Sequence, residues 1–236
     1  MAEILPLLRT GPWAEATASA AALLAVDGIA VSAGSGSGET EVIWSSDGAS
    51  RGFEDLQLVL GLGPGPDCLA GGIPVRVPDL ARVREDRWPA LLMEASALNV
   101  KAVFCFPLRI GAITLGVLTL VRTTPGRMSP VQGDDVTVLT GVLTERVLEL
   151  GDPRLSSPEN QASAAQVLPQ AVVHQATGMV SVQLAVPLAE ALLRLRAHAY
   201  SNSRTLTETA RDIVDRRLRL DPEPPPTNRS DDPDED

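Results

Sequence analysis

The stretch VFCFPLRIGAITLGVLTLV, residues 103–121, decides how the first part of this chain folds. It is apolar enough to suggest a membrane span, but Pro107, Arg109 and Gly111 interrupt it. A span needs about 20 predominantly apolar residues, whereas two short apolar runs around a glycine are typical of neighbouring strands joined by a tight turn. We therefore expect two buried strands, one on each side of Gly111.

The segments around this strand pair predict a mixed domain over residues 1–150. Helical spacing of apolar residues predicts helices, and short β-branched or alternating runs predict strands. The expected helices cover residues 13–25, 51–60, 88–98 and 130–150. The expected strands cover residues 28–33, 40–44, 73–77, 100–110 and 112–121. The strand at 73–77 suits a sheet edge because it contains Pro74. Antiparallel strands flanked by helices give an α+β fold.

The sequence offers no recognisable catalytic or metal-binding set. The glycine-serine segment 34–38 joins two expected strands, and no Gly-Lys-Ser or Gly-Lys-Thr follows it, so it is not a phosphate-binding loop. Cys68 and Cys105 form neither a CxxC motif nor a zinc spacing, and His174 and His198 lie outside the first domain. We expect no enzyme, no metal and no cofactor, with both thiols as small core residues.

Composition indicates a soluble protein of the cytoplasm. Of the 236 residues, 44% are hydrophobic, which is enough for a substantial core. The N-terminus lacks the basic and apolar regions of a secretory signal. Two cysteines far apart in the sequence fit a reducing compartment.

Charge divides the chain unevenly. The net charge is -10, yet residues 161–220 carry 7 arginines against 4 acids. Residues 221–236 carry 7 acids against one arginine. This proline-rich acidic tail is expected to be disordered, either as a solubilising tail or as a polyanion that competes for the basic region. Gly, Pro and Ser mark a linker over residues 151–162.

The basic region, residues 163–220, is predicted to be an all-α domain of three helices. The first covers about 163–185, and residues 168, 172, 175, 179 and 182 form a short coiled-coil-like seam that a packed core face would explain equally well. The second helix begins at Pro187. The third opens with Thr205-Leu-Thr-Glu208, a capping box, and acid–arginine pairs at 212/216 and 215/219 are expected to support it.

Four arginines of this region are not fully explained by local acids: Arg194, Arg196, Arg204 and Arg211. Arg196 and Tyr200 lie one turn apart on one helix face. Guanidinium groups suit phosphate oxygens, and an exposed ring can stack on an unpaired base. The alternatives are a solvated face for the arginines and a core or rim position for Tyr200.

The first domain resembles a GAF domain, of the variety found in actinobacterial regulators. The residues that carry this resemblance lie in four segments, 61–70, 74–79, 87–91 and 104–118. The resemblance implies a sheet whose covering loops enclose a pocket for a small-molecule ligand, and first and last helices that pair across a homodimer. The signature of cyclic-nucleotide binding is absent.

The second domain resembles an ANTAR domain. The pattern consists of A-x-G at 176–178, E-A-L-x-x-L-R-x-x-A-aromatic at 190–200, and L-x-x-x-A-x-x-I-V at 206–214. The resemblance implies binding of paired hairpins in nascent transcripts, which prevents termination. The expected RNA-binding residues are Ala176, Gly178, Arg194, Arg196, Tyr200, Arg204 and Arg211. For Ala176 and Gly178, tight helix packing is the alternative role.

Two functions follow as hypotheses. In the first, the chain is a homodimeric antitermination regulator in which the GAF domain controls RNA binding by the ANTAR domain, without contact to a membrane. In the second, it is a ligand-sensing dimeric signalling protein whose C-terminal helices bind a protein partner and not RNA.

Overall fold

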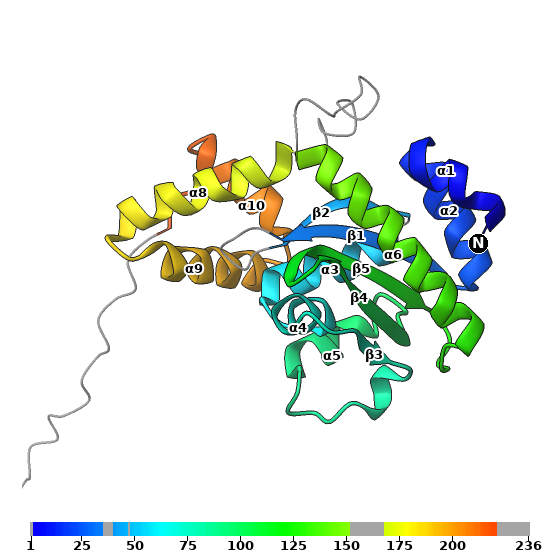
Figure 1. The fold of residues 1–236 in the computed structure, drawn as a ribbon. Coiled ribbons are helices and arrows are strands. Elements are labelled where there is room, and N and C mark those ends of the chain that lie inside the picture. Colours follow the sequence, from blue (N-terminus) through cyan, green and yellow to red (C-terminus); the bar gives the residue numbers. More distant parts are fainter. Residues whose placement is uncertain (1, 35–39, 47, 152–167, 221–236) are drawn as a thin grey trace, which may run out of the picture.

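The computed structural model describes residues 2–34, 40–46, 48–151 and 168–220 (Figure 1). Its centre is an antiparallel five-stranded sheet in the order β2-β1-β5-β4-β3. The strands are β1 (Gly28–Gly34), β2 (Thr40–Ser45), β3 (Val75–Val77), β4 (Ala102–Ile110) and β5 (Ile113–Arg122). The α+β class expected for the first domain is confirmed.

The strand pair expected around Gly111 forms the middle of this sheet. β4 and β5 pair from Ala102–Arg122 to Ile110–Ile113. Gly111 turns the chain between them with a φ of 57°, in the left-handed region that favours glycine. The strand expected at 73–77 is the edge strand β3, shortened to three residues because its pairing with β4 starts after Pro74.

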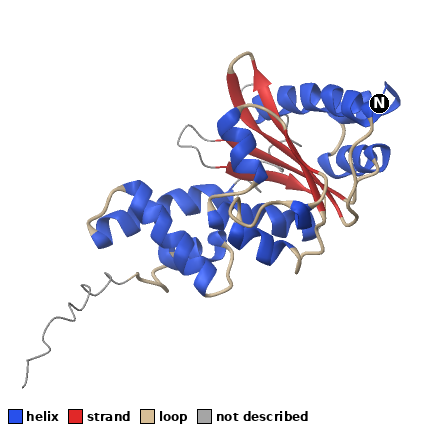
Figure 2. Ribbon diagram, turned by 90° about the horizontal axis from the view of Figure 1, so that it is seen from below, coloured by secondary structure: helices blue, strands red, loops and turns tan. Residues whose placement is uncertain are grey.

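Helices cover both faces of the sheet (Figure 2). One face packs against α1 (Leu5–Thr10), α2 (Trp13–Leu24) and α6 (Pro130–Gly151), whose apolar side chains form the larger core. The other face packs against α3 (Gly48–Leu60), α4 (Pro64–Gly71) and α5 (Pro89–Ala95). Short 3-10 turns, Ala2–Ile4 and Leu80–Arg82, precede α1 and follow β3.

Two buried arginines hold the first of these layers together. Arg122, at the end of β5, donates from Nε to the carbonyl of Ala25 at 3.1 Å, just beyond the end of α2. Arg146 of α6 lies over the ring of Trp13 at 4.1 Å and donates to the carbonyl of Leu8. These guanidinium groups satisfy helix-end carbonyls and are part of the scaffold.

The C-terminal region folds into α8 (Leu168–Leu184), α9 (Leu188–Ser201) and α10 (Leu206–Val214). We call these helices the three-helix unit. Pro187 lies just before α9, in the N-cap position and not inside the first turn as expected. The start of the first predicted helix, nearly all of the predicted linker and the acidic tail lie outside the described residues. None of the helices in the described ranges could cross a membrane.

The three-helix unit packs against the first domain of the chain through α3. Val59 of α3 is buried and belongs to the same apolar cluster as the core of the unit. Figure 1 shows α9 and α10 next to α3, with α8 farther out. The two parts of the molecule therefore share a buried contact.

Candidate functional site

The apolar positions of the C-terminal pattern form one common core. Residues from all three helices meet there and are at most 7% exposed. They are Ala176, Ala191, Leu192, Leu195, Ala199, Leu206, Ala210 and Ile213. The apolar positions of the pattern are thus spaced so that three helices can pack against one another. The arginines of the pattern do not belong to this core.

Ala176 and Gly178 differ in their surroundings. Ala176 is fully buried between the helices, so its side chain has no surface to offer to a ligand in this arrangement. Gly178 is half-buried, and a Cβ added there would meet no atom within 4 Å. Thr177, between them, is buried and donates to the carbonyl of Val173 at 2.8 Å.

Arg196 lies against the end of α3. A Cβ added to Gly61 would lie 2.9 Å from Nη1 of Arg196, so only a glycine lets the guanidinium group approach the backbone this closely. Gly61 also has a φ of 65°, which favours glycine for a second reason. Arg196 therefore faces the first domain and not the open side of the three-helix unit.

Tyr200 lies one turn beyond Arg196 and faces the same way. Its hydroxyl lies 3.5 Å from Oε1 of Glu94 on α5, at the limit of a hydrogen bond. We call the contact between Val59, Gly61 and Glu94 on one side and Arg196 and Tyr200 on the other the docking surface. A cavity of about 560 Å³ runs beside it, with Asp55, Leu98 and Arg204 among its lining residues.

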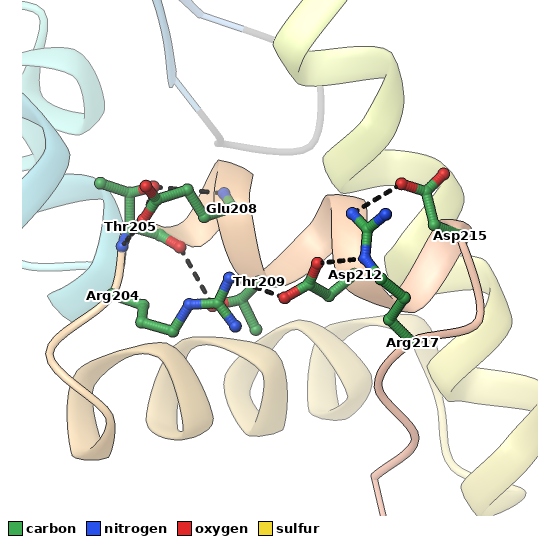
Figure 3. A network of polar contacts seen from close by, with 7 residues as sticks. All are labelled: Arg204, Thr205, Glu208, Thr209, Asp212, Asp215 and Arg217. Carbon is green, nitrogen blue, oxygen red and sulfur yellow. Dashed lines mark hydrogen bonds and ion pairs between the residues drawn. The ribbon is translucent and has the colours of Figure 1, made fainter.

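Arg204 belongs to a polar network along α10 (Figure 3). Its Nη2 lies 2.6 Å from Oδ2 of Asp212, and Arg217 reaches both Asp212 and Asp215, at 2.9 and 2.8 Å. Hydrogen bonds from Arg204 and Arg217 lower the pKa of Asp212. Arg204 therefore already has a carboxylate partner in this arrangement.

The acid–arginine pairs expected at 212/216 and 215/219 are wrong. α10 ends at Val214, and Arg216 turns the chain with a φ of 60°, so the helical spacing of four residues does not continue. Arg217 forms ion pairs with the carboxylates of Asp212 and Asp215 instead. The predicted capping box is confirmed: the Thr205 hydroxyl accepts from the amide of Glu208, and the Glu208 carboxylate accepts from the amide of Thr205.

The other two predicted arginines face outward. Arg194 forms an ion pair with Glu190, one turn earlier on α9, at 2.8 Å. Arg211 of α10 is exposed, and among the described residues no carboxylate pairs with it. The structure does not bring all seven predicted residues to one surface, because Arg196 and Tyr200 lie at the docking surface while Ala176 is internal.

A polar cluster that sequence reasoning missed lies inside the first domain. Glu54 of α3 is 5% exposed and accepts a hydrogen bond from Gln57, whose carbonyl oxygen in turn accepts from the amide of Gly65. Burial raises the pKa of Glu54 to about 7. The sequence signal that could have revealed this cluster is Glu54 itself, an acidic residue among the apolar positions of α3.

The two cysteines are buried next to this cluster. Burial raises the pKa of Cys68 to about 12 and the pKa of Cys105 well above its ordinary value. The thiolate is the reactive form, and it is strongly disfavoured here. Their surroundings are those of core residues. Among the described residues, no group of three or more metal-ligating side chains occurs.

Comparison with known proteins identifies the first domain. The family model described as "GAF domain" matches residues 13–150, more than half of the chain. The chain therefore belongs to the GAF domain family, which places a sensor domain of signalling proteins in front of the three-helix unit. A search of the curated proteins found no match.

Two solved structures of GAF domains are similar to part of this chain. The GAF domain of a phosphoenolpyruvate-protein phosphotransferase from Acinetobacter aligns with a TM-score of 0.52 and 12% identity, over 64% of this chain and 91% of that one. The GAF domain of a phosphoenolpyruvate-protein phosphotransferase from Coxiella burnetii aligns with a TM-score of 0.49 and 13% identity, over 62% and 89%. The alignment with the Acinetobacter domain shows a common fold, and an identity of 12% shows nothing about ligands.

Proposed function

We propose that this chain is a non-enzymatic transcription antitermination regulator in the cytoplasm. Its GAF domain receives a signal, and its three-helix unit, of ANTAR type, binds hairpins in nascent mRNA. The observation that carries the proposal is the shared core described above. Each apolar position of the ANTAR-like pattern except Gly178, Tyr200 and Val214 is buried in it, and none of the arginines belongs to this core.

Charge supports the choice of RNA as the ligand. Residues 161–220 hold a positive balance in a chain of net charge -10. Arg211 is exposed without a carboxylate partner in the described part, and Arg194 has only an exposed local one, which water and salt screen. Both guanidinium groups are therefore available for phosphate oxygens at little cost.

The docking surface supplies a route by which the sensor controls the unit. Arg196 and Tyr200 contact α3 and α5 in this structure, so the same side chains do not reach RNA at the same time. The docked arrangement is then the state with weaker RNA affinity. A signal that loosens α3 or α5 releases both side chains, and the equilibrium shifts toward binding.

The test is a titration of the full chain with an RNA of two tandem hairpins at several salt concentrations. We expect affinity to fall steeply with salt, because phosphate contacts release counterions. Arg211→Gln should weaken binding roughly threefold to tenfold and flatten the salt slope by about 0.7–0.9. Arg9→Gln, which removes an exposed arginine from α1, is the matched control. Absence of binding, or equal losses in both variants, contradicts the proposal.

Exposed apolar residues on the three-helix unit favour a protein contact as well. Val182, Leu188 and Leu193 are 83%, 62% and 63% exposed. Val182 is the last position of the predicted seam, and the buried face of α8 is a different one, at Val173, Ala176 and Val180. We assign these exposed side chains to contacts with the partner of a homodimer. If the RNA titration fails, they support the alternative, in which the unit binds a different protein.

A further inference from the structure

An unusual number of arginines surrounds one cavity of the first domain. The cavity measures about 880 Å³ and lies between the β3–α5 connection and the β5–α6 connection. Its charged lining residues are Arg76, Arg82, Arg84, Arg87, Arg127 and Asp79. We call this cavity the arginine pocket. It shares no lining residue with the cavity beside the docking surface.

These arginines do not serve the fold in the way that the buried ones do. Arg122 and Arg146 are at most 9% exposed and hold main-chain carbonyls. The five guanidinium-bearing residues of the pocket are all exposed. A repulsive cluster of cations on an acidic protein needs another explanation.

Local acids neutralise the pocket only in part. Arg84 pairs with Asp86, and Arg87 pairs with Asp67 at 3.1 Å, but all four side chains are at least 41% exposed, and such pairs contribute little. Within the described residues, neither Arg76 nor Arg127 has a carboxylate partner; Arg76 lies over the ring of Phe106 at 5.5 Å. The guanidinium groups of Arg76 and Arg127 can therefore donate hydrogen bonds to an anion.

The one carboxylate in the lining is already engaged. Asp79 accepts from the amide of Ala81 at 3.1 Å, which caps the short turn that starts at Leu80, and it pairs with Arg82 at 3.2 Å. Three of the five guanidinium groups of the lining therefore have a carboxylate partner, and two have none. A ligand with several negative charges fits this balance better than a single carboxylate does.

The walls of the pocket are fixed relative to one another. The amide of Gly126 donates to the carbonyl of Pro78 at 2.8 Å, which joins the two connections. Arg122 donates to the carbonyl of Arg127 at 3.4 Å, so a buried side chain holds the main chain of a lining residue. Because these walls are already ordered, the protein loses less conformational entropy when a ligand binds.

We propose that the arginine pocket binds a small molecule with a chain of phosphate groups, and that it recognises the phosphates. Planar guanidinium groups match phosphate oxygens with two parallel hydrogen bonds. The volume lies within the range of small-molecule sites. The only aromatic residue among the arginines of this loop, Trp88, is buried at 2% exposure and offers no open face to a base. Binding is therefore independent of the base.

The test uses the full chain without divalent cations and titrates it with ATP, GTP, tripolyphosphate, orthophosphate and sulfate. Heat of binding is measured together with tryptophan fluorescence, because the Arg87 guanidinium lies over the Trp88 ring at 4.2 Å and a ligand that draws it away changes that signal. We expect the first three probes to saturate one site with similar affinity. Orthophosphate and sulfate should bind at least about tenfold more weakly, because they make fewer charged hydrogen bonds.

The variant Arg76→Gln/Arg127→Gln should weaken ATP binding about tenfold or more, since it removes the two guanidinium groups without acid partners. The control Arg9→Gln/Lys101→Gln removes two exposed positive charges elsewhere and should leave the affinity within about twofold. Equal losses in both variants overturn the proposal, as does a lack of saturation or equal affinity for sulfate. If the pocket variant no longer binds hairpin RNA but still binds ATP with the parent affinity, the arginines of the pocket bind nucleic acid, and the proposal is wrong.

Discussion

Glu54 shows how one buried side chain gives this sensor a dependence on pH. Burial raises its pKa to about 7 in the folded protein, while the ordinary value is 4.5. The folded state thus holds the proton more tightly than the unfolded chain does. Its stabilising effect is fully present below pH 4.5 and is lost as the pH increases through about 7.

We predict that the free energy of unfolding decreases by roughly 3 kcal/mol from this group as the pH increases from 4.5 to above 7. Glu54→Gln keeps the shape and removes the titration, so its stability should vary less over this interval. Urea unfolding at several pH values measures both. Glu15→Gln, an exposed change on α2, should retain the parent profile. A parent and a Glu54→Gln protein with parallel pH profiles would show that the carboxyl is solvated after all.

Single positions also show where sequence reasoning stops. The Thr205–Glu208 capping box was predictable because both partners lie within one turn. The pairing of Asp212 was not, since it depends on where α10 ends and on Arg204 from the preceding loop. The position of Arg196 over Gly61 depends on two segments that lie more than a hundred residues apart.

Among the elements, α3 contacts both the sheet of the GAF domain and the core of the three-helix unit. One of its faces packs on the sheet, and Val59 at its far end enters the core of the three-helix unit. The helix therefore connects the interior of the sensor to α9. A change in the polar cluster around Glu54 acts on the same helix that holds the docking surface.

We predict that Val59→Ala strengthens RNA binding without altering any proposed RNA contact. Deletion of two buried methyl groups weakens docking by about 1–2 kcal/mol. If the docked state dominates, hairpin affinity should increase up to roughly tenfold. Val142→Ala makes the same deletion in the other core, behind α6, and controls for general loss of stability. If Val59→Ala leaves the RNA affinity unchanged, or if Val142→Ala increases it equally, docking does not control RNA binding and the prediction is wrong.

The elements that the sequence predicted are those with a long periodic pattern or a clear turn. The β4–β5 pair, α2 and α6 have such patterns, and the structure confirms them. The helices α1 and α4 were not predicted, because six and eight residues that include prolines give too little periodicity. The arginine pocket was also beyond reach, since Arg127 joins the other four through the tertiary fold.

The whole molecule is a GAF domain joined to a three-helix unit by a buried contact. The charges of the two parts are opposite in sign over the sequence, and the side chains at their contact include two of the expected RNA-binding residues. Under the proposed function, docking to the sensor and binding of RNA are then alternative uses of one surface. The arginine pocket lies in different loops, so a failure of either proposal leaves the other standing.

The most direct test is hydrogen exchange of the full chain with and without an RNA of two tandem hairpins. If RNA displaces the docked sensor, amides at the end of α3, around Val59 and Gly61, should exchange faster when RNA is added. Amides of α9 and α10 should exchange more slowly in the same sample. RNA that binds while the α3 amides keep or gain protection would contradict the account.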